Sequence, residues 1–430
     1  MPVTVNAALA SSDITPPVGT PMSGYPDLRR DLPWAPDAIK GYVGRRQQPS
    51  EGIHDPLLAT ALALEAGGTR AVIVGLDTLV VSAAFTDEVR EALADDGVAP
   101  ENVLVAASHT HSGPDLFAWW EGEPASAPAA ATVERTVSAA RKALARLEKA
   151  ELAVGLGSLD HVSVNRRDEV GGAIDPTVGV VRATSARDGS VLGLVVAFAC
   201  HPVTLDYSNF LFSADYVWAL RETLARAYPG AQCLFLNGAA GNINPARFPY
   251  EQRANIYVPQ TLDNYPVYWG GFGDAGRLGR TLAGAAMQAA ERALPVEVAA
   301  PTGRLVPVSL PLKRGAELEQ YLDFMHFRSE AYRRSLTGRA ELESSVQSLA
   351  IGSLRLLALP GEVFVEIGLE LKATAGVEPL VLVGYANDDV RYVMTDDAYV
   401  AGQYETVGTP LAAGSASALA TAARCALDAL

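Results

Sequence analysis

Short runs of mostly apolar residues alternate along the chain with longer segments in which apolar residues recur at the helical period. The short runs are typical of buried strands, and the longer segments are typical of amphipathic helices. The expected strands are 58–65, 71–76, 103–107, 178–183, 192–199, 233–236, 305–312, 354–359 and 380–384. The expected helices are 84–94, 132–149, 214–227, 274–294, 317–335 and 416–427. This alternation predicts an α/β fold, with a mixed β-sheet core flanked by helices.

Two stretches interrupt the pattern. Residues 124–131 are rich in Ala, Pro and Ser, which is typical of a surface loop. Residues 247–269 are rich in Tyr, Phe, Trp and Pro and have no clear period. Aperiodic loops of this length in compact domains are commonly lids or binding loops, and a packed excursion over the core is the alternative. Neither stretch is a long linker, so we expect a single domain over residues 1–430.

Composition narrows the class of protein. A chain of 430 residues, 49% of them hydrophobic, can bury a large core. Its formal net charge of −15 argues against nucleic acid and against anionic membrane surfaces as partners, because both attract basic patches. The three cysteines show no Cys-x-x-Cys spacing, which fits a reducing compartment. The oligomeric state is left open, and a homo-oligomer is compatible with the sequence.

The N-terminal residues have no basic segment followed by a long apolar core, so no signal peptide is evident. No run reaches the roughly 20 apolar residues that a membrane span needs. We therefore expect a cytoplasmic protein without a transmembrane segment.

The strand expected at 103–107 ends in the segment Ser-His-Thr-His-Ser-Gly-Pro at 108–114. Residues two apart on a strand point to the same face, so His109 and His111 would lie together at the strand's end. Open α/β sheets bind ligands at such ends, and imidazole suits both zinc and acid–base chemistry near neutral pH. Taken alone, the pair is equally compatible with two histidines that hydrogen bonds satisfy within the core.

Other chemistry-bearing residues also follow apolar runs. They are His201, Glu362, Tyr392 and Tyr404. Two imidazoles and a carboxylate from separate strand ends make the usual three-ligand set of a catalytic zinc site. Each residue has an ordinary alternative: a core histidine, a helix-capping glutamate, or packing tyrosines. Their repeated occurrence at strand ends favours the metal site.

With these motifs the chain resembles the neutral/alkaline, non-lysosomal ceramidases, which are zinc-dependent amide hydrolases. The matching motifs run in family order from about residue 10 to 410. They are Asp13-Ile14-Thr15-Pro16-Pro17 with Gly19, Met22, Gly24 and Tyr25, then Asp55-Pro56-Leu57, the segment 108–114, Asn165-Arg166-Arg167, Cys200-His201-Pro202, Gly241-Asn242-Ile243-Asn244-Pro245, Pro360-Gly361-Glu362 and residues 392–404. The resemblance implies a ceramidase-like catalytic domain without the C-terminal β-sandwich with which that family continues.

The resemblance also implies individual roles. The zinc ligands would be His109, His201, Glu362 and Tyr392. The residues that act on the substrate or line the site would be His111, Tyr404, Arg166 and Arg167. His111 would face the substrate, accept a proton from the attacking water and return it to the leaving amine. Tyr404 would donate a hydrogen bond to the developing oxyanion. Asp77, after the strand at 71–76, is a candidate to orient a ligand histidine, with a capping or turn role as the alternative.

The chain departs from the family at Asn244, where ceramidases carry a serine with a catalytic role. An amide donates and accepts hydrogen bonds but is no hydroxyl nucleophile, so the chemistry would rest on zinc-bound water. Together with the aromatic stretch 247–269, Phe117, Trp119 and Trp120 would reshape the pocket. Ceramide itself is therefore a doubtful substrate, and a smaller, more soluble amide or ester is easier to defend.

We accordingly expect a zinc-dependent hydrolase that cleaves an amide C–N bond of a small or N-acyl substrate with zinc-activated water. Two alternatives stay open. One is an ester or lactone hydrolase that uses the same zinc site, because the oxyanion chemistry is shared. The other is a catalytically silent relative that binds a ligand.

Overall fold

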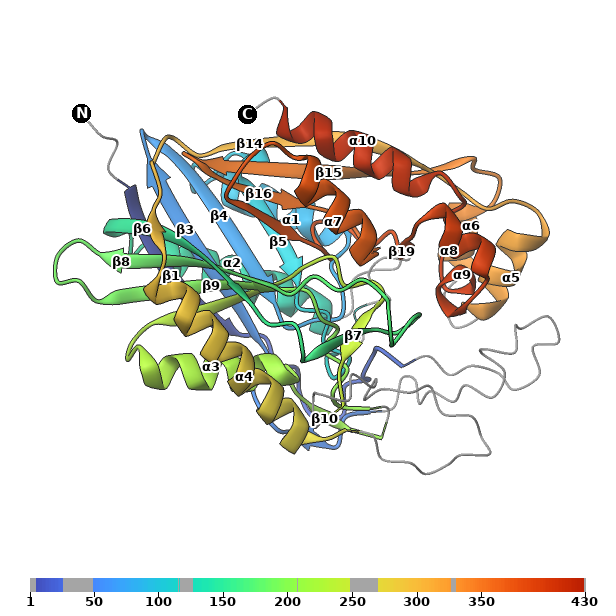
Figure 1. The fold of residues 1–430 in the computed structure, drawn as a ribbon, viewed down its shortest axis with the longest axis horizontal. Coiled ribbons are helices and arrows are strands. Elements are labelled where there is room, and N and C mark those ends of the chain that lie inside the picture. The colour runs from blue at the N-terminus through green and yellow to red at the C-terminus, as the bar shows by residue number, and fades with distance from the viewer. Residues whose placement is uncertain are drawn as a thin grey trace.

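The computed structural model describes residues 5–25, 49–114, 116, 127–206, 208–247, 270–325 and 330–428 (Figure 1). It confirms the expected α/β class, with a large mixed sheet and helices around it. The loop candidate at 247–269, apart from its first residue, lies outside the described residues, as do Phe117, Trp119 and Trp120.

The larger sheet is mixed, because β4–β5 and β9–β11 pair in parallel and its other pairs are antiparallel. In spatial order its strands are β11 (Gln232–Asn237), β9 (Val191–Phe198), β8 (Thr177–Ser185), β6 (Glu148–Ser158), β1 (Val5–Asp13), β3 (Leu58–Ala66), β4 (Thr69–Leu76) and β5 (Val103–Ala107), with β13 (Leu294–Pro295) paired to β6. The central strands are apolar on both sides because both faces of this sheet are covered.

A smaller sheet packs against one face of the larger one. Its strands, in spatial order, are β14 (Thr302–Pro311), β15 (Glu341–Ile351), β16 (Leu354–Ala358) and β18 (Leu380–Val383). Alternate side chains of β5 and of β16 enter different cores. Leu104 of β5 and Leu356 of β16 meet between the sheets, whereas Val105 and Leu357 face the helices outside them.

Helices cover the two outer faces, so the layers run helix, sheet, sheet, helix (Figure 1). On the larger sheet lie α1 (Ala83–Ala94), α2 (Ala127–Leu144), α3 (Tyr216–Ala227) and α4 (Phe272–Glu291). On the smaller sheet lie α7 (Val365–Thr374) and α10 (Ser415–Leu427), while α5 (Ala316–Phe324) contacts α9 (Tyr404–Val407) beyond the end of that sheet. The remaining helices are α6 (Glu330–Leu336), α8 (Asp396–Ala401) and the 3₁₀ turn η1 (Pro100–Asn102).

Three short strand pairs stand at the ends of the sheets. They are β10 (Leu211–Phe212) with β2 (Gly52–Ile53), β12 (Ile243–Pro245) with β7 (Ser163–Asn165), and β17 (Glu362–Val363) with β19 (Tyr392–Val393). Over the described ranges, no helix combines the length and the apolar character that crossing a membrane requires.

Three expectations about local structure were wrong. The loop expected at 124–131 is helical from Ala127, because a proline in the first turn of a helix loses no intrahelical hydrogen bond. The helix expected at 132–149 ends at Leu144, and its last residues already belong to β6. The single helix expected at 317–335 is two helices, α5 and α6. The sequence pattern between them shows no break that would have separated the two.

The segment that follows β18 joins the two sheets. Tyr385 O accepts a hydrogen bond from Ala107 N (3.0 Å), and Asn387 N donates to Val105 O (2.8 Å), so this segment extends the larger sheet beyond β5. The side chain of Asn387 completes the pairing, because its Oδ1 accepts from Val105 N (3.1 Å) and its Nδ2 donates to Gln347 Oε1 (2.8 Å). Asn387 has a φ of 63°, a conformation that asparagine tolerates better than most residues.

We expect Asn387→Ala to lower the free energy of unfolding by about 2–5 kcal/mol, because two buried partners lose their hydrogen bonds and alanine is strained at positive φ. Urea unfolding measures this change. Asn6→Ala is the control, since Asn6 makes one long hydrogen bond, 3.3 Å, to partly exposed Glu65. Equal losses in the two variants would contradict the bridging role.

Candidate metal centre

The ends of three strands are tied together where the two ligand-type histidines emerge. Asn237, the last residue of β11, donates through Nδ2 to Ser108 O (3.0 Å) and to Cys200 O (3.2 Å). Its Oδ1 accepts from Cys200 N (3.2 Å). The residues that follow Ser108 and Cys200 are His109 and His201, so a single buried amide brings the two histidines together from β5 and β9.

Glu362 reaches the same place from the smaller sheet. It begins β17, and its N–H donates to Arg391 O (2.9 Å). Next to it, Val363 O accepts from Gly241 N (2.8 Å), which fixes β17 against the loop after β11. A Cβ at Gly241 would lie 2.4 Å from Glu362 O, so only glycine allows this approach. The carboxylate is thereby placed among the histidines by backbone contacts.

Backbone carbonyls determine which nitrogen of each histidine carries the proton. His109 Nδ1 lies 2.6 Å from Leu79 O, and His201 Nδ1 lies 2.7 Å from Ala240 O. A carbonyl only accepts, so each Nδ1 is the donor, and the neutral form of either ring presents a lone pair at Nε2. Burial lowers the pKa of His201 to about 4, which leaves its ring neutral near pH 7.

The Nε2 atoms of the two histidines face a carboxylate and a third imidazole. Glu362 Oε2 lies 3.2 Å from His109 Nε2 and 3.3 Å from His201 Nε2, and His111 Nε2 lies 3.3 Å from His109 Nε2. Four-coordinate zinc with bonds of about 2.0–2.1 Å separates its ligand atoms by about 3.3 Å. The spacing therefore fits ligands around one cation.

The histidines form a group that could hold a metal ion, with ligand nitrogens of His109, His111 and His201 all within 4.8 Å of one another. Burial tends to raise the pKa of Glu362, but the adjoining histidines and Arg391 outweigh it and hold that pKa well below its usual range. His109 has a φ of 71°, an uncommon conformation that is typical of functional sites. The predicted metal site is thus compatible with the donor atoms, their charge and their spacing.

The two predicted tyrosines stand next to these donors. Parallel pairing of β17 with β19 places Tyr392 directly opposite Glu362. The rings of Tyr392 and Tyr404 lie edge to face with centroids 6.1 Å apart. Arg166 lies over both rings, with its guanidinium carbon 5.4 Å and 5.8 Å from their centroids. Burial raises the pKa of Tyr404, so its phenol keeps its proton.

The predicted arginines share one carboxylate. Arg166 Nε lies 2.7 Å from Glu405 Oε1, and Arg167 Nη1 lies 2.5 Å from Glu405 Oε2. Two guanidinium groups against one buried carboxylate leave a net positive charge beside the tyrosines. This positive charge would stabilise negative charge that develops on a bound substrate.

Asn244 lies on β12, opposite Val164 of β7, and is buried. The carbonyl of its neighbour Ile243 accepts from His201 N (2.9 Å). Asn244 therefore directly follows a residue that is hydrogen-bonded to a predicted ligand. This position is compatible with a site residue, and its role stays a prediction.

Asp77 does not orient a ligand histidine, contrary to one of the two possibilities left open. Its carboxylate pairs through both oxygens with Arg221 of α3 and accepts from Leu58 N (2.8 Å). The histidines are oriented by carbonyls instead, and a sequence carries no signal for those. Asn237 was missed, although an amide directly after an apolar run is the same signal that drew attention to the histidines.

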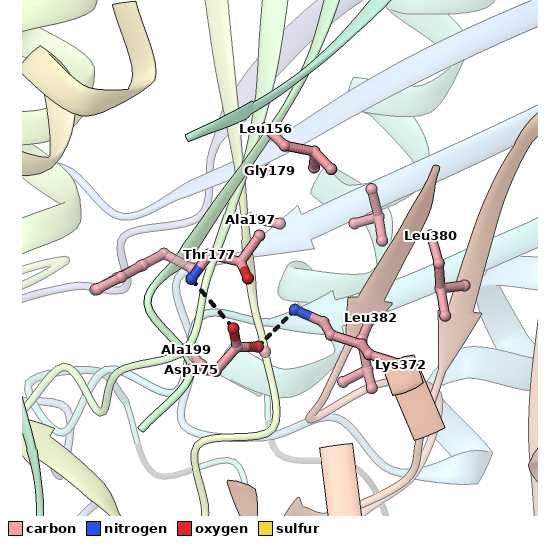
Figure 2. A pocket seen from close by; sticks show the side chains of 12 residues that line it. Leu156, Asp175, Thr177, Gly179, Ala197, Ala199, Lys372, Leu380 and Leu382 are labelled. Atoms are coloured by element: carbon pink, nitrogen blue, oxygen red, sulfur yellow. Dashed lines mark hydrogen bonds and ion pairs between the residues drawn. The ribbon is translucent and has the colours of Figure 1, made fainter. Parts of the chain in front are cut away.

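One small cavity lies away from these donors, between the larger sheet and β18 (Figure 2). The ion pair Lys372 Nζ–Asp175 Oδ2 (2.5 Å) stands at its wall, and Thr177 N donates to Asp175 Oδ1 (3.1 Å). Its volume of about 20 Å³ is room for about one water molecule. It is therefore no candidate substrate site.

Comparisons with known proteins agree with the motifs. Residues 33–219 match the model of a family described as neutral/alkaline non-lysosomal ceramidase, N-terminal. The neutral ceramidase of Pseudomonas aeruginosa is 26% identical in an alignment 436 positions long, which covers 84% of this chain and 64% of that protein. The neutral ceramidase of Mycobacterium tuberculosis is 23% identical in an alignment 479 positions long, which covers 85% of this chain and 70% of that protein.

Solved structures support the fold. The crystal structure of the Pseudomonas aeruginosa neutral ceramidase aligns with a TM-score of 0.75 at 23% identity, over 99% of this chain and 74% of that one. A ceramidase complexed with C2 aligns with a TM-score of 0.74 at 21% identity, over 100% and 76% of the two chains. The expected fold and the resemblance to this family are confirmed, and the chain spans about two thirds of the length of these relatives.

We expect Glu362→Gln to lower zinc affinity by at least about 100-fold without destabilising the metal-free protein. The amide keeps the size of the side chain and both donates and accepts hydrogen bonds, but it is a poor zinc ligand. Wild-type stability should rise by about 2.7 kcal/mol when free zinc is 100 times its dissociation constant. Glu370→Gln, at an exposed ion pair, is the control. Equal zinc stabilisation of Glu362→Gln and wild type would exclude Glu362 as a ligand.

Proposed function

We propose that this protein, which resembles the neutral/alkaline non-lysosomal ceramidases, is a zinc-dependent hydrolase that cleaves the amide C–N bond of a small or N-acyl substrate. The observation that carries the proposal is the convergence of His109 Nε2, His201 Nε2 and Glu362 Oε2, with each histidine nitrogen 3.2–3.3 Å from the carboxylate oxygen in a buried place. The names of the relatives supply the reaction class.

In this proposal zinc is held by His109, His201 and Glu362, with Tyr392 as the fourth protein ligand. The pairing of β17 with β19 supports this set, because it places Tyr392 beside Glu362. Zinc, when bound, polarises a carbonyl and lowers the pKa of a water ligand to about 7.

His111 is proposed to carry the proton. Burial, followed by the neighbouring His109, lowers the pKa of His111 well below its usual value, so the imidazole is neutral and able to accept. Its Nε2 takes the proton of the attacking water as the new C–O bond forms. The same atom then donates that proton to the leaving nitrogen as the C–N bond breaks, which leaves a carboxylic acid and an amine.

Tyr404 and the arginines are proposed to stabilise the oxyanion. The phenol of Tyr404 stays protonated and donates to the oxygen of the scissile carbonyl. Arg166 and Arg167 both pair with Glu405, so these three described side chains together carry one net positive charge beside it. A fixed charge in a buried site stabilises developing negative charge more strongly than the same charge in water.

Asn244 is proposed to bind the substrate through its amide, since it has no hydroxyl to attack with. Water is then the nucleophile. This difference from the family serine is why we propose a smaller, more soluble amide in place of ceramide.

The test is turnover of a panel of N-acyl amides, matched esters and lactones by protein freed of metal and then given zinc. We expect hydrolysis of at least one amide that depends on zinc and is abolished in His109→Ala. Turnover of esters or lactones alone would make the protein an esterase or lactonase. Zinc binding without turnover of any class would favour a silent ligand-binding relative.

Gly24→Ala tests the role of His111. A Cβ at Gly24 would lie 2.7 Å from the Cα and Cβ of His111, so the imidazole must move. We expect kcat to fall about 100-fold, as for a 1 Å misplacement, while zinc affinity is kept. Gly19→Ala is the matched control, because Gly19 also has positive φ but nothing lies within 4 Å. Loss of zinc together with activity would make His111 a ligand instead.

A further inference from the structure

Tyr385 packs flat against the predicted ligand His109. Their ring centroids lie 4.2 Å apart with an angle of 26° between the planes, and Tyr385 is 1% exposed. We propose that Tyr385 is a positioning residue that holds the imidazole plane of His109 and thereby aims Nε2 at the metal. This inference rests on the metal centre of the proposed function.

His109 needs such support because of its backbone. Its φ of 71° departs from strand geometry, and β5 ends two residues earlier, at Ala107. The hydrogen bond from Nδ1 to Leu79 O fixes one point of the imidazole, and a flat contact is needed to fix its plane. The histidines on the metal side meet it edge on, at 82° for both His111 and His201, which leaves the face for Tyr385.

Tyr385 is itself held by the two segments that supply ligands. Its N–H donates to Gly361 O (3.1 Å), next to Glu362, and its carbonyl accepts from Ala107 N (3.0 Å), two residues before His109. Its φ of 53° is uncommon for a bulky side chain and persists only where the surroundings determine the conformation. One residue therefore couples the segments that carry His109 and Glu362.

The hydroxyl is not part of this role. The buried Tyr385 OH has no hydrogen-bond partner among the residues that the structure describes. The ring is what touches His109, so phenylalanine should position the imidazole as well as tyrosine does. Tyr385→Phe thus separates the ring contact from the phenol.

The experiment measures the zinc dissociation constant of the whole chain by competition with a chelator. We expect Tyr385→Met and Tyr385→Leu, which fill space without a flat face, to weaken zinc binding about 10- to 100-fold, as loss of a residue that orients a ligand does. Tyr385→Phe should stay within about 3-fold of wild type. The absorption spectrum of the cobalt-substituted protein should change in the first two variants and not in the third.

Phe235→Leu is the control for lost core packing, because Phe235 is also 1% exposed and lies in a different core cluster. Its zinc affinity should equal that of wild type, whatever its stability. Wild-type affinity in a folded Tyr385→Met or Tyr385→Leu variant would overturn the positioning role alone, and so would equal weakening in Phe235→Leu or in Tyr385→Phe. A wild-type protein that binds no zinc would overturn the metal centre of the proposed function as well.

Discussion

The close approach of two imidazoles to one carboxylate is the constraint on which the site depends. His109 Nε2 and His201 Nε2 each lie within 3.3 Å of Glu362 Oε2 in a buried place. Burying a carboxylate is unfavourable unless positive charge or hydrogen-bond donors stand beside it. The surrounding fold must therefore be stiff enough to hold them together. Carbonyls at both Nδ1 atoms supply part of that stiffness, because they prevent either ring from turning its donor inward.

The two-sheet architecture explains how distant segments meet there. In the larger sheet β5 and β9 stand far apart in strand order, and Asn237 at the end of β11 joins the residues that follow them. The smaller sheet delivers Glu362 and Tyr392 on paired short strands. Tyr385 and Asn387 then bind the edge of β5, so both sheets meet at the metal donors. A change in sheet packing would consequently be felt by the ligand geometry.

The order of apolar and polar residues along the chain predicted the strands and the side chains at their ends. An apolar run that ends in His-x-His marked β5 and its exit, and the same reasoning found His201 and Glu362 at the ends of other runs. The contacts that it missed join residues that are far apart in the sequence. The flat contact of Tyr385 with His109 joins residues from different sheets, and the carbonyl partners of the histidines have no side-chain signature. Asp77 was assigned a possible histidine partner because a carboxylate at a strand end fits both outcomes, and only the packing of α3 brings Arg221 to it.

Asn244 changes which groups would supply the nucleophile and carry the proton in the proposed site. Without a hydroxyl at that position, no side chain on β12 can form an acyl intermediate, so the proton of the attacking water needs its own carrier. His111 suits this task because burial keeps it neutral, and because Gly24 leaves room for its ring while Tyr25 packs against it at 5.0 Å. Gly24 and Tyr25 would then affect catalysis by positioning His111 rather than by holding the metal. A change there should alter turnover before it alters metal binding, which separates the catalytic neighbour from the ligands.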